Sequence, residues 1–95
     1  MMTPQALGHA LYSVETLIYG AAERLEFFAG RDHPLLRLLH HYTDPAVGAE
    51  YWRLFAPPET SGTAGIAQPI EAHIAAAEQF LSALEAAIEA ARESH

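Results

Sequence analysis

Histidine and carboxylate side chains gather in the middle of the chain, where they could bind a metal ion. His40, His41 and Asp44 lie close together in the sequence, and in a continuous helix His40 and Asp44 would share one face, four residues apart. Imidazole nitrogens and carboxylate oxygens are common ligands of divalent metals. Asp44 also precedes a proline, which is the usual place of a helix N-cap. The segment therefore has two interpretations, a metal site of these three residues or a helix boundary with a capping aspartate.

A second cluster of chemically distinctive residues follows, and it is aromatic. Tyr51, Trp52, Arg53 and Phe55 stand just before a pair of prolines. Tyr, Trp and Arg are enriched at the energetic centres of protein interfaces, because they combine large burial with a polar group. We expect these four residues to bind a partner protein, with Trp52 only partly buried at the edge of its helix. In the alternative interpretation, Trp52 and Phe55 anchor a short helix to the core.

The chain carries no motif for catalysis or for cofactor binding. It contains 0 Cys, so neither disulfides nor thiolate nucleophiles can form. The Gly-containing stretch 60–65 matches neither a phosphate-binding loop nor a dinucleotide fingerprint. The glutamates of the carboxyl-terminal segment lack the Glu-x-x-His motif of di-iron bundles. We therefore predict no catalytic residue and no cofactor.

Charge and hydropathy limit the classes of partner. The formal net charge is −7 at pH 7, so most of the surface should repel a nucleic-acid backbone. No stretch is long and apolar enough to cross a membrane, and the first residues lack the basic and apolar segments of a signal peptide. We expect a cytoplasmic protein that binds neither nucleic acid nor membranes.

Two long helices are predicted to position these clusters. Thr3 followed by proline is a typical helix start, and Gly30 is a typical helix stop, so the first helix should cover about residues 4–29. A proline also opens the second long helix, which should cover about residues 69–93.

Two short helices are expected between the long ones. One should begin at Pro34 and the other should run from Pro45 to Phe55, because proline fits the first turn of a helix. Residues 56–68 are rich in Pro, Gly and Thr and should form a long loop. The length of this loop suggests either mobility or function, and the sequence does not decide between them.

Both long helices carry an apolar stripe with alternating steps of four and three residues, the repeat of helices that pack lengthwise. The core or dimer seam should include Leu11, Ile18, Leu25, Ile74, Phe80, Leu81, Leu84 and Ile88. We therefore predict one all-α domain over residues 1–95, in which the two long helices pack antiparallel and the short helices cap one end.

The apolar arc of the last helix is wider than one partner helix can cover, because His73, Ala76 and Phe80 form a second row beside the stripe. Either the short helices or a second chain should cover this arc. A chain of 95 residues builds a small core, which favours stabilisation by self-association.

The predicted function is a non-enzymatic interaction module. We expect a homodimer that completes the helical bundle and offers its middle segment to a further protein. The alternative is a bundle that binds a small ligand or a metal through the histidines and the aspartate of that segment, His33, His40, His41 and Asp44.

Overall fold

The computed structural model describes residues 3–57 and 69–94, and these residues form helices and no strand. The all-α prediction is confirmed. The elements in chain order are α1 (Pro4–Ala29), α2 (Pro34–Arg37), the 3₁₀ helix η1 (Leu38–Tyr42), α3 (Pro45–Phe55) and α4 (Ile70–Glu93). Most of the predicted loop, from residue 58 to residue 68, lies outside the described residues.

The boundaries of α1 follow from local chemistry, as predicted. The Thr3 hydroxyl accepts a hydrogen bond from the Ala6 amide at 3.1 Å, which satisfies one of the donors that the first helical turn leaves open. Gly30 ends the helix with a φ of 88°, a backbone conformation that residues with a Cβ atom rarely adopt.

The two short helices also begin where the sequence indicates. His33 Nδ1 accepts from the Leu35 amide at 3.1 Å, and Asp44 Oδ1 accepts from the amides of Ala46 and Val47 at 3.0 and 3.4 Å. Asp44 is therefore the N-cap of α3, as the second interpretation of that residue proposed.

The segment after α2 winds as a 3₁₀ helix rather than as a continuing α-helix. Residues three apart lie on one side of a 3₁₀ helix. Leu38 is accordingly buried, and His41 on the same side is half-buried. The one-face arrangement of His40 and Asp44 required an α-helix through residue 44, and η1 does not provide it.

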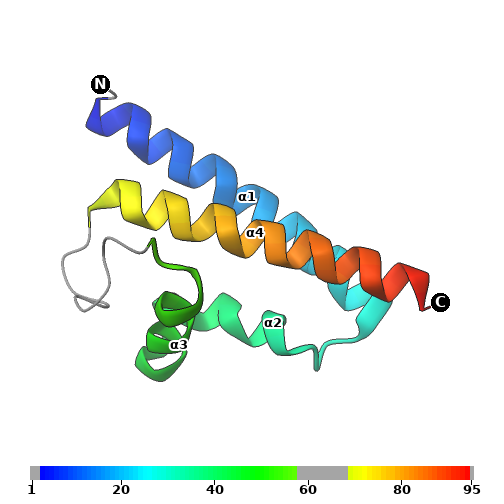
Figure 1. Cartoon of the computed structure of the whole chain (residues 1–95). Coiled ribbons are helices and arrows are strands. Elements are labelled where there is room, and N and C mark those ends of the chain that lie inside the picture. The colour runs from blue at the N-terminus through cyan, green and yellow to red at the C-terminus, as the bar shows by residue number, and fades with distance from the viewer. Residues whose placement is uncertain (1–2, 58–68, 95) are drawn as a thin grey trace.

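α1 and α4 pack lengthwise against each other, but they run parallel, and the antiparallel prediction is wrong (Figure 1). Phe28 at the end of α1 lines the same hollow as Ala87 and Ala91 at the end of α4. The reason is the connection between the two helices. It is no short hairpin loop, because α2 and η1 run back along the pair and return the chain to the end where α1 begins.

The predicted seam is the core of a single chain. Leu25, Phe80 and Leu84 are the largest fully buried side chains. The other seam residues divide into the buried Ile18 and Ile88 and the half-buried Leu11, Ile74 and Leu81. The seam therefore holds α1 and α4 of one molecule together.

The wide apolar arc of α4 is covered within the chain by α3. Phe80, from the second row of that arc, has an exposed fraction of 0 %. Its ring centroid lies 5.4 Å from that of Tyr51 and 5.3 Å from that of Phe55, both on α3. Of the two explanations for the arc, coverage by the short helices is the one that the structure shows at Phe80.

Candidate functional site

The most closely packed group of aromatic rings joins η1, α3 and α4. The rings of His41 and Tyr51 are stacked, with centroids 3.8 Å apart and planes inclined by 5°. Phe80 meets Tyr51 edge-on, at an interplanar angle of 88°. Edge-on contacts such as that of Phe80 with Tyr51 stabilise aromatic pairs beyond the apolar area that they bury. This group fastens the middle segment to α4.

His41 is adapted to this apolar setting in its uncharged form. Burial lowers its pKa from 6.5, and this effect outweighs the hydrogen bond to the Leu38 carbonyl and the nearby Glu15 carboxylate, which both raise it. The ring nitrogen Nδ1 donates to the Leu38 oxygen at 2.8 Å. Burial likewise raises the pKa of Tyr51. The stacked pair is therefore neutral at pH 7.

The structure does not assemble the predicted metal site. His40 is exposed, His41 is turned into the aromatic group, and Asp44 binds the first amides of α3. Within residues 3–57 and 69–94, no three or more His, Asp or Glu side chains gather in a way that could hold a metal ion. The prediction for His40, His41 and Asp44 is therefore wrong for the chain alone, because the 3₁₀ winding and the helix cap separate the three side chains.

The predicted partner-binding cluster is divided between the core and the surface. Tyr51 and Trp52 are only 4 % and 6 % exposed, so the expected partial exposure of Trp52 is wrong. Phe55 is half-buried and Arg53 is exposed. The Trp52 ring packs 5.2 Å from that of His73, and its indole nitrogen is buried without a hydrogen-bond partner among the described residues. Trp52 therefore anchors α3 to α4, as the alternative interpretation proposed.

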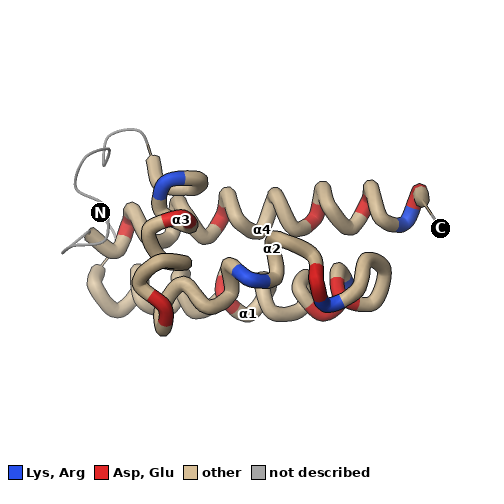
Figure 2. Tube along the Cα trace, turned by 90° about the horizontal axis from the view of Figure 1, so that it is seen from below, with Lys and Arg blue, Asp and Glu red and all other residues tan. Residues whose placement is uncertain are grey.

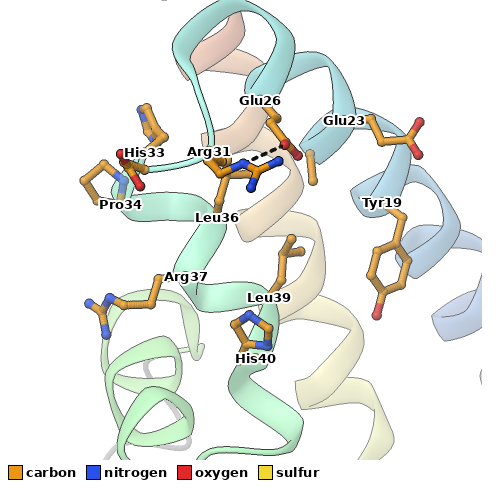
Figure 3. A pocket seen from close by; sticks show the side chains of 12 residues that line it. Tyr19, Glu23, Glu26, Arg31, His33, Pro34, Leu36, Arg37, Leu39 and His40 are labelled. Carbon is orange, nitrogen blue, oxygen red and sulfur yellow. Dashed lines mark ion pairs between the residues drawn. The ribbon is translucent and has the colours of Figure 1, made fainter.

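A groove of about 760 Å³ lies between the second half of α1 and the α2–η1 segment (Figure 3). Its apolar lining includes Ala22, Leu36 and Leu39. Polar side chains also line it, among them Tyr19, Glu23, Arg31, Asp32, His33 and His40. His33 and His40 thus share this groove, whereas His41 and Asp44 do not line it. The four residues proposed for a small-ligand site are not gathered in one pocket.

The two arginines of the groove already have partners. The Nε atom of Arg31 lies 3.7 Å from a carboxylate oxygen of Glu26, and Arg37 forms an ion pair with Glu50 of α3. The first pair lies at the turn after α1, and the second joins α2 to α3. Exposed ion pairs contribute little to stability. They leave the groove without an unpaired arginine that could attract an anion.

A different surface, not predicted from the sequence, lies on α1. Four of the six large hydrophobic side chains that are exposed in the described residues belong to this helix. Two of them, Leu17 at 59 % and Phe27 at 80 % exposed, fall in a row with steps of four and three residues. This row, here called the outer row, consists of Ser13, Leu17, Gly20, Arg24 and Phe27.

The outer row has a simple relation to the core. Each member stands one residue before a core position, Val14, Ile18, Ala21, Leu25 or Phe28, and therefore lies about 100° around the helix from it. The sequence analysis did not identify this row. Its signal is a second seven-residue repeat on α1, which contains fewer apolar residues than the repeat that forms the core. Leu17 and Phe27 are the two residues that reveal it.

The exposed side of α4 has the opposite character. Its exposed carboxylates recur along the helix, as Figure 2 shows, and comprise Glu71, Glu78, Glu85, Glu89 and Glu93. Arg92 pairs with Glu89 at 3.2 Å and is the only Arg or Lys of α4. The two long helices thus present an apolar row and an acidic face.

Comparison with known protein families, with curated proteins and with solved structures finds no match for this chain. Among the described residues, no helix combines the length and the hydropathy needed to cross a membrane.

Proposed function

We propose that this protein is a non-enzymatic helical interaction module, and that it pairs with a second copy of itself along the outer row of α1. The observation that carries the proposal is the exposure of Leu17 and Phe27 at coiled-coil spacing on a helix whose other side is packed against α4. Large apolar side chains exposed in register are typical of surfaces that bind another helix.

The distribution of charge favours α1 over α4 as the pairing surface. Two copies that met through α4 would bring five exposed carboxylates of each chain together. The outer row contains one charged residue, Arg24, in a chain whose net charge is −7. Self-association along α1 therefore avoids most of the repulsion between two acidic molecules.

The non-enzymatic part of the proposal is supported by what the histidines do. His33 caps α2, and His41 packs against Tyr51 and donates to the Leu38 carbonyl. Both side chains have structural roles that account for their positions. We therefore assign a binding role, and no catalytic role, to the exposed outer row of α1.

A pair of matched leucine variants tests the proposal. Leu17 on α1 and Leu54 on α3 are exposed to similar degrees, 59 % and 48 %. Wild-type protein of 10.4 kDa should sediment with twice that mass at concentrations on the order of 100 µM, since a single pair of helices gives a small interface. Leu17→Glu should sediment as a monomer, because it buries a carboxylate in the interface. Leu54→Glu should remain a dimer.

Circular dichroism checks that both variants keep the wild-type helix content, since each substitution is on an exposed side chain. A wild-type protein that stays monomeric at this concentration would refute the proposal. So would a dimer that Leu54→Glu dissociates and Leu17→Glu does not.

A further inference from the structure

We infer that the two copies lie antiparallel along the outer row, with the twofold axis crossing the pair at the height of residue 22 and with Arg24 of each copy seated over Gly20 of the other. This inference rests on the proposed function and adds the arrangement of the partner. It follows from the order of residue sizes and charges in the row.

The row is complementary to itself when one copy is reversed. In an antiparallel pair, facing residues are placed symmetrically about the axis, and Ala22 is midway both between Leu17 and Phe27 and between Gly20 and Arg24. The same axis therefore sets Phe27 against Leu17 of the second copy and Arg24 against Gly20 of the second copy. Each contact occurs twice because of the twofold symmetry. In one contact two large apolar side chains meet, and in the other the long side chain of Arg24 lies over a glycine, which has no side chain.

Gly20 provides the space that this contact needs. A Cβ atom built at Gly20 would have only the guanidinium of Arg24 of its own chain within 4.0 Å. That guanidinium is the flexible end of an exposed side chain, so it can move to the facing copy. The helix surface at Gly20 is otherwise open to an approaching side chain.

Arg24 also has no carboxylate partner within residues 3–57 and 69–94. The ion pairs of the described residues use Arg31, Arg37 and Arg92, and none of them includes Arg24. In the antiparallel pair, Glu23 of the second copy stands about 4.5 Å along the helix axis from Arg24, at a rise of about 1.5 Å per residue. An arginine side chain spans this offset, so the pair supplies the missing partner.

A parallel pair in register lacks both advantages. It would set Arg24 against Arg24 and Gly20 against Gly20, which opposes two like charges and leaves a gap beside them. The direction of pairing is therefore decided by Arg24 and Gly20, whereas the two apolar residues would tolerate either direction.

Disulfide trapping distinguishes the antiparallel from the parallel arrangement. The chain has 0 Cys, so any disulfide must form between the introduced cysteines. Leu17→Cys and Phe27→Cys proteins are mixed in equal amounts and oxidised with oxidised glutathione. We expect a mixed disulfide between the two variants as the main product. Like residues should not join, because residue 17 of one copy lies about 15 Å along the axis from residue 17 of the other. Leu54→Cys serves as the control and should remain unlinked.

The outcomes separate this inference from the proposed function. Disulfides between like residues, or no disulfide in a protein that sedimentation shows to be dimeric, would overturn the antiparallel arrangement and leave self-association standing. A protein that sediments as a monomer would remove both.

Charge reversal gives a second test that needs no cysteine. Arg24→Glu should raise the dimer dissociation constant at least about tenfold, because four carboxylates then meet at the axis. Arg53→Glu is the matched control, since Arg53 is exposed on α3 and also has no ion pair among the described residues; it should not change the constant. The double variant Glu23→Arg with Arg24→Glu should restore dimerisation. Equal effects of the two single reversals, or a failure of the double variant to restore dimerisation, would overturn the arrangement.

Discussion

At Gly48, α3 packs directly against the backbone of η1. A Cβ atom at this position would lie 2.8 Å from the carbonyl oxygen of His41, and backbone cannot move aside as a side chain end can. Gly8 in α1 is a natural comparison, because nothing lies within 4 Å of the Cβ atom that it lacks. The two glycines share a helical conformation and differ only in what surrounds them.

We therefore expect opposite effects of the same substitution. Gly8→Ala should raise the free energy of unfolding by about 0.5–1 kcal/mol, because alanine loses less backbone entropy in a helix. Gly48→Ala should lower it by about 1–3 kcal/mol, because the clash outweighs that gain. Urea denaturation followed by circular dichroism measures both. A stabilised Gly48→Ala would show that α3 does not dock on η1 in this way.

His41 makes the stability of the protein depend on pH. Its pKa in the folded state is below the value of 6.5 for a free side chain, because burial disfavours the charged ring. The folded state thus binds a proton less readily than the unfolded state. The stability that results is fully present above about pH 6.5 and is lost as the pH falls through the pKa of the folded state.

The matching variant is His41→Phe, which keeps an aromatic ring against Tyr51 and cannot be protonated. Wild-type protein should lose more stability than this variant between pH 7.5 and pH 5, a range chosen to span the value of about 6.5. Thermal unfolding at a series of pH values compares the two. Parallel pH profiles would mean that His41 carries no part of the dependence.

At the scale of residues, the helix caps could be predicted from the sequence, but the direction in which a side chain points could not. Thr3, Asp44 and Gly30 act through backbone groups a few residues away, so their roles can be recognised in the sequence. Trp52 is different. Its burial depends on which side of α3 meets α4, and a helix of 11 residues with aromatic groups on several sides does not reveal that.

Burial differences along α4 give a test at the scale of elements. Leu84 is fully buried, whereas Leu81, three residues earlier on the same helix, is half-buried. Leu84→Ala should cost about 2–5 kcal/mol of unfolding free energy, and Leu81→Ala should cost clearly less, because part of its surface already meets water. Denaturant titration measures the unfolding free energy of both variants. Equal losses would mean that a second molecule covers Leu81 in solution.

The elements themselves were predictable, but the direction of packing was not. The apolar stripes, with proline and glycine at the boundaries, predicted the four α-helices. Two long amphipathic helices favour an antiparallel hairpin only when a short loop joins them. Here the chain between Gly30 and Pro69 carries α2, η1 and α3, and its course back along the pair makes α4 parallel to α1.

At the scale of the whole molecule, the two long helices expose different kinds of side chain to solvent. α4 faces solvent with carboxylates, and α1 faces it with the outer row and with Tyr12 and Tyr19. The sequence predicted self-association from small size and surplus apolar residues. It placed the contact either at the seam or on the wide apolar arc of α4, and the structure uses the seam residues for the core.

The parallel course of α1 and α4 gives one molecule a permanent dipole along its length. Peptide dipoles of about 3.5 D align within each helix, so α1 and α4 contribute about 90 D and about 85 D, and parallel helices add. The short return through α2 and η1 opposes only part of this sum. In the proposed pair, the twofold axis runs across the helices and reverses the direction of the second copy, so the dipole components along the helices cancel. A single chain is therefore a polar rod that an electric field can orient, and the antiparallel pair is not.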